Sequence, residues 1–145
     1  MEQDFWMKTE DDCDLFVRSW GKDMKDPKAV IIISHGMTEH IGRYRHVGAN
    51  FNKEGYIAYG DDHRGHGKTG EKQGQLGFIA EKDGFQLLID DLSLLVSHIK
   101  DEHPGLPIFI FAHSMGSFIA RNYIQQHSDE IHGVILSGSG NFPKK

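Results

Sequence analysis

The sequence contains a single cysteine, Cys13, so no disulfide can form within the chain. Nothing therefore points to an oxidising compartment. The longest apolar runs, residues 29–33 and 108–112, are much shorter than the roughly 20 residues that cross a bilayer. The first ten residues are acidic and mixed, and they lack the basic and apolar regions of a signal peptide. We therefore expect a cytoplasmic protein that does not insert stably into membranes.

The sequence also contains fewer basic than acidic residues. The 16 Lys and Arg residues are outnumbered by 21 Asp and Glu residues, which gives a net charge of -5. The basic residues are scattered, whereas a nucleic-acid-binding protein needs a basic patch that displaces counterions. No nucleic-acid partner is expected. The 145 residues are 38% hydrophobic and 26% charged, which is typical of one globular domain.

Strand and helix signals alternate along the chain. Apolar residues three or four apart predict an amphipathic helix over residues 83–102. Two short aromatic and β-prone stretches, 5–9 and 15–20, flank the acidic turn 10–12 and predict a hairpin. The other expected strands are 30–33, 56–59, 108–111 and 134–136, the other expected helices are 46–54 and 114–126, and a Gly-rich loop is expected over 61–77. This order predicts an α/β fold: a mostly parallel sheet with helices on both faces and an antiparallel N-terminal hairpin at its edge.

Ser114 lies where a buried strand runs directly into a helix. Small residues, Ala112 and Gly116, stand two positions before and two after it, which is the nucleophile-elbow pattern. A turn this tight requires tiny flanking side chains, and it lifts the hydroxyl to the N-terminus of a helix, where negative charge is favoured. The pattern usually begins with Gly rather than Ala. The alternative is that Ser114 is an ordinary helix N-cap.

His35 and Gly36 follow the end of the strand over residues 30–33. Sites form at the carboxyl ends of strands in open parallel sheets. An acyl-transfer site needs two backbone N–H donors for the oxyanion, one from the residue after the nucleophile and one from a loop after an earlier strand. Met115 and Met37 are the candidates. The alternative for His35-Gly36 is a plain turn at the end of a strand.

The segment 61–67 combines Asp61, Asp62, His63 and His66. The spacing of these side chains fits no established metal-site pattern, and the interspersed glycines favour a tight turn. No metal site is predicted. Gly67-Lys68-Thr69 superficially resembles part of a P-loop, but it lacks the upstream glycine spacing and the strand-to-helix junction.

Three segments, 34–44, 61–69 and 113–116, together resemble the monoacylglycerol lipase and lysophospholipase branch of the α/β-hydrolases, the serine aminopeptidase S33-like hydrolases. The resemblance covers nearly the whole chain. It implies a serine ester hydrolase that acts on small ester or lipid substrates and needs no cofactor. It further implies the following roles: Ser114 as nucleophile, Met37 and Met115 as oxyanion-hole N–H donors, His35, Gly36, His113 and Gly116 as supporting residues, Glu39-His40 and Arg43-Tyr44 as the residues that order the loop behind the oxyanion hole, and 62–67 as the loop that buttresses the rim of the site.

The remaining triad residues are not evident. A triad in this fold runs in the order Ser, Asp or Glu, then His. His127 lies 13 positions along the helix from Ser114, which is about 20 Å at 1.5 Å per residue. Asp129 and His132 follow at that far end, so none of these side chains can reach the hydroxyl. The resemblance places the missing Asp and His beyond Lys145, after a substrate-covering cap and further strands.

We therefore expect residues 1–145 to be a single, truncated N-terminal part of an α/β-hydrolase domain, inactive or weakly active by itself. The last strand would then be an exposed apolar edge that pairs with another copy or with a complementing C-terminal fragment. Two alternatives stay open. The chain is either a non-catalytic, self-associating fragment, or part of an aminopeptidase-type hydrolase when complete.

Overall fold

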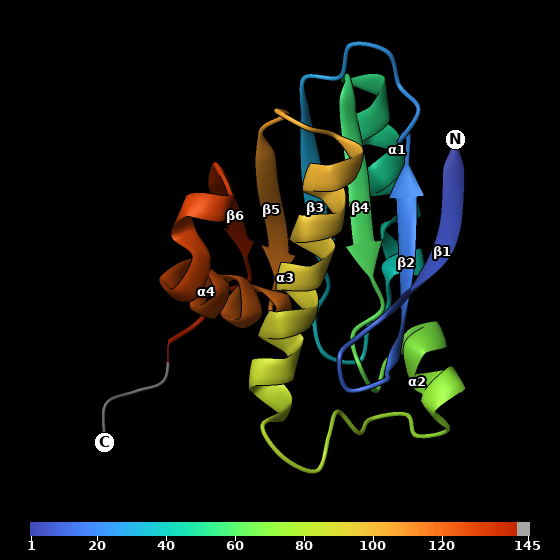
Figure 1. Cartoon of the computed structure of the whole chain (residues 1–145), viewed down its shortest axis with the longest axis vertical. Helices are drawn as coiled ribbons and strands as arrows, with labels where there is room; N and C mark the ends of the chain where they lie inside the picture. The colour runs from blue at the N-terminus through green and yellow to red at the C-terminus, as the bar shows by residue number, and fades with distance from the viewer. Residues whose placement is uncertain (142–145) are drawn as a thin grey trace.

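The computed structural model describes residues 1–141, and within them the chain forms one six-stranded sheet in the order β1-β2-β4-β3-β5-β6 (Figure 1). The elements in chain order are β1 (Glu2–Lys8), β2 (Asp14–Trp20), β3 (Ala29–Ser34), the 3-10 helix η1 (Ile41–Tyr44), α1 (Arg45–Lys53), β4 (Tyr56–Asp61), α2 (Gly67–Gln73), α3 (Gly84–Glu102), β5 (Ile108–His113), α4 (Met115–His127), the 3-10 helix η2 (Ser128–Glu130) and β6 (Gly133–Ser137).

The predicted hairpin and parallel strands are confirmed. β1 pairs antiparallel with β2, with Phe5 opposite Val17, and β2 pairs antiparallel with β4. The strands β4, β3, β5 and β6 are parallel to their neighbours. All parallel strands therefore end at the same edge of the sheet, where the loops after β3 and β5 meet.

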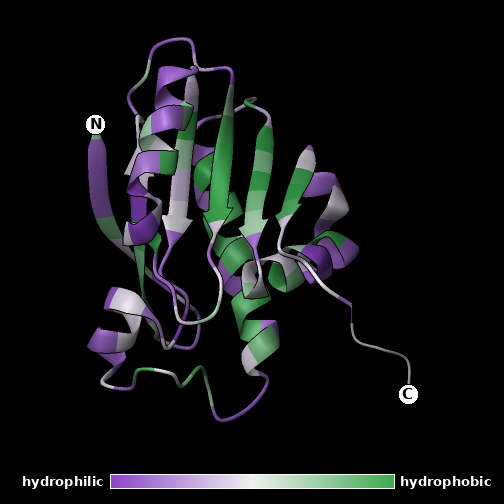
Figure 2. Ribbon diagram, turned by 180° about the vertical axis from the view of Figure 1, so that it is seen from behind, coloured by the Kyte–Doolittle hydropathy of each residue, from purple (hydrophilic) through white to green (hydrophobic). Residues whose placement is uncertain are grey.

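Helices cover both faces of the sheet. In Figure 1, α3 and α4 lie in front of the sheet, and α1 lies behind it near β2 and β4. Every residue of β3 is buried, as expected for a central strand covered on both faces. Figure 2 shows the central strands β3 and β5 in the green of hydrophobic residues. The main core forms between these strands and α3 and α4, and a smaller cluster around Phe16 and Trp20 packs under α1.

The sequence-based assignment of residues 61–77 as a loop is wrong in part, because this segment contains α2. Two glycines within the helix, Gly67 and Gly70, make it a poor helix former by propensity. Tertiary hydrogen bonds hold it instead. The Asp62 carboxylate accepts from the Lys68 amide at 2.8 Å, and the buried Thr69 hydroxyl donates to the Asp62 carbonyl at 2.7 Å and accepts from the Phe16 amide at 2.9 Å.

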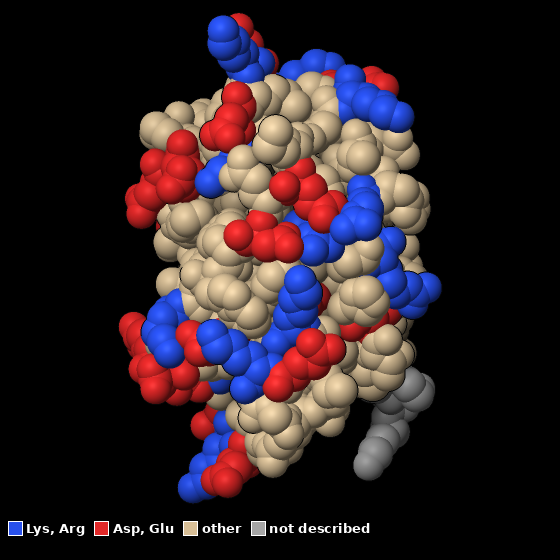
Figure 3. All heavy atoms as spheres, turned by 90° about the vertical axis from the view of Figure 1, so that its right-hand side faces the viewer, with Lys and Arg blue, Asp and Glu red and all other residues tan. Residues whose placement is uncertain are grey.

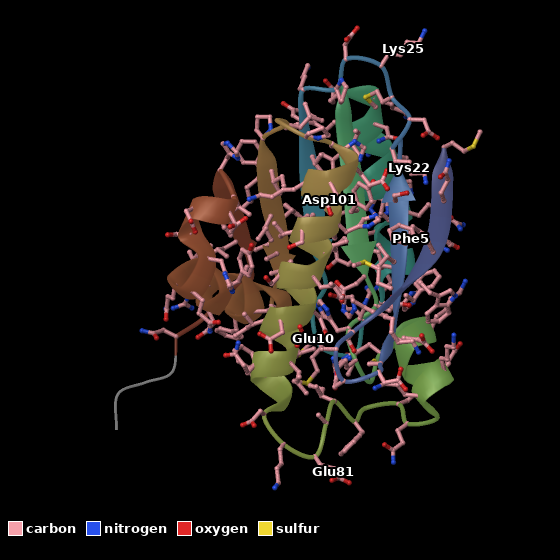
Figure 4. All side chains as sticks on the ribbon, viewed as in Figure 1. Phe5, Glu10, Lys22, Lys25, Glu81 and Asp101 are labelled. Atoms are coloured by element: carbon pink, nitrogen blue, oxygen red, sulfur yellow. The ribbon has the colours of Figure 1, made fainter. Side chains whose placement is uncertain are left out.

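The hairpin side of the molecule is stabilised by aromatic contacts and mixed charges. Phe5, labelled in Figure 4, packs between the hairpin and α3, with its ring 5.0 Å from that of His98. On the face shown in Figure 3, acidic and basic side chains interleave rather than separate by sign. Ion pairs such as Arg18–Asp4 at 2.6 Å and Lys72–Asp14 at 3.2 Å account for part of this mixing.

The opposite edge of the sheet is apolar. Among residues 1–141, β6 pairs with β5 alone, and its Ile135 and Leu136 are 52% and 44% exposed. Phe111 of the neighbouring strand is only half-buried, on the face away from α3 and α4. Among residues 1–141, no helix is both long and apolar enough to cross a membrane.

Candidate active site

Ser114 forms the corner between β5 and α4, and its backbone is strained. Its φ of 52° and ψ of -117° are rare for a residue with a side chain, and such conformations cost about 1–3 kcal/mol. It occupies the N-cap position of α4, but its side chain makes no capping hydrogen bond. The ordinary N-cap interpretation therefore does not describe this residue. Its side chain remains partly accessible at the N-terminus of the helix.

The small neighbours of Ser114 are required by close backbone contacts. A Cβ atom on Gly116 would lie 2.2 Å from the Ser34 carbonyl oxygen and 2.7 Å from that of His35. The first turn of α4 therefore lies directly against the end of β3. Ala112 is fully buried on the other side of the corner. The glycine of the small-x-Ser-x-Gly pattern is therefore required by the approach of α4 to the end of β3.

The loop after β3 meets the same corner. A Cβ on Gly36 would lie 3.1 Å from the Ser114 Cβ, so this glycine brings the loop into contact with the serine. Met37 follows with its side chain 63% exposed, whereas Met115 is 8% exposed. Within residues 1–141, the backbone amides of Met37 and Met115 donate to no acceptor. Two free donors therefore lie in segments that flank Ser114.

Glu39 organises the outer part of this loop. Its Oε2 atom accepts from the Gly36 amide at 2.7 Å and from the Tyr44 hydroxyl at 2.9 Å. The guanidinium of Arg43 lies 3.3 Å from the other oxygen, Oε1. Burial raises the pKa of Glu39, but the Gly36 amide and Tyr44 hydroxyl lower it more, so the net pKa is below its usual value. The carboxylate stays ionised at neutral pH and keeps the Gly36 amide occupied.

The segment 62–67 is held in place by Asp62. Its carboxylate accepts from the Ile41 amide at 2.7 Å as well as from Lys68. Burial raises the pKa of Asp62 and outweighs these hydrogen bonds. The segment 61–67 is therefore connected to η1, and through it to the loop after β3.

The histidines and acid near α4's far end lie away from Ser114. The His132 ring accepts from the Ile108 amide at 3.2 Å, at the start of β5. Ser114 follows the other end of this six-residue strand, which is about 20 Å away at roughly 3.3 Å per residue. His127 stacks on Tyr123 at 5.0 Å, at the C-terminus of α4, and Asp129 follows in η2. His113 bonds to the Ser137 hydroxyl at 3.1 Å. Within residues 1–141, no imidazole is bonded to the Ser114 hydroxyl.

The sequence analysis missed two buried ionic groups near the site. Asp61 pairs with His63 at 3.0 Å, and Arg64 pairs with Asp91 at 2.8 Å. Among the described residues, no three His, Cys, Asp or Glu side chains are arranged to hold a metal ion. The Asp-x-His spacing after a strand was the only sequence signal for the first pair. The second pair joins residues 27 positions apart, and no local pattern indicates it.

Comparison with known proteins agrees with this geometry. The family model described as "Serine aminopeptidase, S33" matches residues 25–144. A monoacylglycerol lipase of Mycolicibacterium smegmatis is 37% identical over 119 residues, which is 82% of this chain and 40% of that protein. The human monoglyceride lipase is 32% identical over 122 residues, 84% of this chain and 38% of that one.

A solved carboxyl esterase from Bacillus coagulans, in complex with glycerol, superposes with a TM-score of 0.89 at 33% identity. It covers 98% of this chain, which in turn covers 46% of the esterase. The chain thus spans less than half the length of these relatives. Because the family model covers most of the sequence and the fold agrees, the chain belongs to the Hydrolase_4 (serine aminopeptidase S33) family of α/β-hydrolases and is similar to its monoglyceride lipases.

Proposed function

We propose that Ser114 is the nucleophile of a serine ester hydrolase, with the amides of Met37 and Met115 as its oxyanion hole. The observation that supports this most is the strained, uncapped backbone of Ser114 beside Gly36. Strain of this kind at a partly exposed hydroxyl is typical of functional positions. His35, Gly36, His113 and Gly116 would support the corner and the loop.

In the proposed reaction the Ser114 hydroxyl oxygen attacks the ester carbonyl carbon while a general base takes its proton. The carbonyl oxygen becomes an oxyanion, to which the two free amides donate, each worth about 3 kcal/mol in the transition state. The alcohol then leaves with a proton, and water releases the acid from the acyl-enzyme. A histidine base and its acidic partner would come from outside residues 1–145. The chain alone is expected to be slow, because a serine without a base is a weak nucleophile.

Glycerolipid-like esters are the proposed substrates, because the mycobacterial and human relatives are monoacylglycerol and monoglyceride lipases. A chimera tests this choice: residues 1–145 joined to the part of the mycobacterial lipase that follows its matched segment. We expect it to hydrolyse monoacylglycerols and p-nitrophenyl esters with a kcat/KM at least about 100-fold above that for aminoacyl p-nitroanilides, a difference of roughly 3 kcal/mol. Preference for the anilides would instead support the aminopeptidase alternative.

The exposed edge of β6 supports a second proposal, that residues 1–145 associate through this strand. An edge strand offers unpaired N–H and C=O groups, and exposed Ile135 and Leu136 add apolar surface. We expect the isolated chain to form dimers or larger species in light scattering, and Ile135→Lys to shift it toward monomer. Leu76→Lys is the matched control, because Leu76 is exposed like Ile135. Val17→Lys is unsuitable because Val17 is buried. A wild-type chain that stays monomeric at about 100 μM would contradict this proposal.

A further inference from the structure

Three histidine rings meet beneath the loop that follows β3. His35 ends that strand, His63 follows β4, and His66 precedes α2. The His35 ring lies 3.9 Å from the ring of His63 and 5.4 Å from that of His66, and all three residues are buried. Nothing in the proposed reaction uses these rings. Their placement under a candidate oxyanion loop therefore needs its own explanation.

Both ring nitrogens of His63 face oxygen acceptors. Nδ1 lies 3.0 Å from a carboxylate oxygen of Asp61, and Nε2 lies 2.9 Å from the His35 carbonyl oxygen, with the Ser34 hydroxyl at 3.4 Å. A neutral imidazole has one N–H, so it would leave one of these acceptors without a donor. With Asp61 ionised, the contacts are satisfied together only by an imidazolium. Burial lowers the pKa of His63, but the charge and hydrogen bond of Asp61, together with the His35 carbonyl and the charge of Asp91, raise it, and the net pKa is above its usual value.

His35 takes the opposite protonation state. Its Nε2 accepts from the His63 amide at 3.0 Å, so the ring proton lies on Nδ1, which donates to the Gly36 carbonyl at 2.8 Å. Burial, followed by the charge of His63, lowers the pKa of His35 well below its usual value. The other polar groups around the cluster have partners: Asp91 is paired with Arg64, and the His66 ring faces the Arg64 carbonyl. Asp61 is thus the counter-ion of His63.

The Gly36 carbonyl and the Met37 amide belong to the same planar, trans peptide group. In such a group the C=O and N–H point in opposite directions. A hydrogen bond from His35 to the carbonyl therefore turns the Met37 N–H away from the histidine cluster. It also polarises the peptide, which strengthens the N–H as a donor. His63 in turn holds the main chain of His35 through its carbonyl.

We propose that Asp61 and His63 are a positioning pair that, acting through His35, fixes the Gly36–Met37 peptide so that its N–H serves the oxyanion. This inference rests on the proposed role of Met37. It assigns neither residue a contact with substrate. A buried ion pair often contributes less to folding stability than apolar side chains of similar volume. The orientation of the Gly36–Met37 peptide explains why the pair is present here.

Long-range proton–nitrogen NMR spectra of the ¹⁵N-labelled 145-residue chain test the pair without any activity assay. At pH 7.5, where an ordinary histidine is mostly neutral, we expect both nitrogens of His63 to carry protons and His35 to carry one, on Nδ1. A neutral His63 at that pH in the wild-type chain would overturn the proposal, and no variant needs to fold for this result.

Variants connect the pair to the peptide. In Asp61→Asn and His63→Gln chains we expect the Met37 amide resonance to shift while that of Gly140 stays in place, and Asp90→Asn, an exposed change, should move neither. An unmoved Met37 amide in a folded Asp61→Asn chain would contradict the proposal. For the functional readout, the maximal rate of fluorophosphonate labelling should fall about 10- to 100-fold in Asp61→Asn with little change in the concentration giving half that rate. Absence of labelling in the wild type would count against Ser114 as nucleophile, and the ring spectra would still decide the pair.

Discussion

In the chimera that restores a complete hydrolase, Ser114→Ala is expected to lower kcat for a p-nitrophenyl ester by about 10⁴-fold or more. Removing the nucleophile of a catalytic triad eliminates the covalent route, and only the oxyanion hole and substrate binding continue to act. The measurement is steady-state kinetics at saturating ester. This effect is larger than that of any other single side chain in the proposed site, because no other group forms a bond to the substrate.

Ser97→Ala is the matched control for this experiment. Ser97 is exposed on α3, so the same change in chemistry there should leave kcat within about twofold and stability within about 0.5 kcal/mol. The Ser114→Ala chimera should also unfold within about 1 kcal/mol of the wild-type chimera, because within residues 1–141 the Ser114 hydroxyl forms no hydrogen bond and only the added histidine would lose a partner. Retention of more than about a tenth of the wild-type kcat would exclude Ser114 as nucleophile.

The largest expected effect on stability comes from Arg64→Met. The Arg64 side chain is 3% exposed and forms two bonds with Asp91, also 3% exposed, at 2.8 and 2.9 Å. It also reaches Asp11 in the β1–β2 turn, beside Glu10, which Figure 4 labels near α3. Without the guanidinium, Asp91 is left buried and unpaired. Burial already raises the pKa of Asp91 and outweighs the effect of Arg64, so this carboxyl depends on its partner to stay ionised. We expect a loss of about 3–5 kcal/mol in the free energy of unfolding.

Urea unfolding of the wild type, Arg64→Met and the double variant Arg64→Met/Asp91→Leu measures this effect. The double variant should recover most of the loss, because two apolar side chains replace the pair without leaving a buried charge. Lys100→Met is the control, because it breaks a surface ion pair: the side chains of Lys100 and Glu130 are 42% and 41% exposed. It should lower the free energy of unfolding by less than about 1 kcal/mol. If Arg64→Met and Lys100→Met lowered the free energy of unfolding equally, the buried Arg64–Asp91 pair would not be the main ionic link between Arg64 and α3.

Local patterns predicted the elements that carry the candidate site. The continuous apolar run of β3 predicts a buried strand, and the three-or-four spacing of apolar residues in α3 predicts an amphipathic helix. The predicted ends of both elements agree with the structure to within a residue or two. The corner at Ser114 was predictable because the strand, the serine and the helix follow one another directly and small residues flank the serine, of which Gly116 is in close contact with the backbone of β3.

Features that depend on distant partners were not predictable. The helix α2 is held by the Asp62 carboxylate, which accepts from the Lys68 amide, and by Thr69, which accepts from Phe16 of β2, whereas its own glycines disfavour a helix. The Arg64–Asp91 pair joins a loop to the middle of α3. The opposite protonation states of His35 and His63 follow from which oxygen atoms surround each ring, and a sequence does not show that arrangement.

Treating the 145-residue chain with a fluorophosphonate and locating the adduct by tandem mass spectrometry tests the nucleophile most directly. A slow adduct confined to the hydroxyl at position 114, lost in the alanine variant and after unfolding in urea, is the result that our assignment predicts. Modification spread evenly over exposed serines such as Ser97 and Ser139, or none at position 114 in the folded chain, would contradict it.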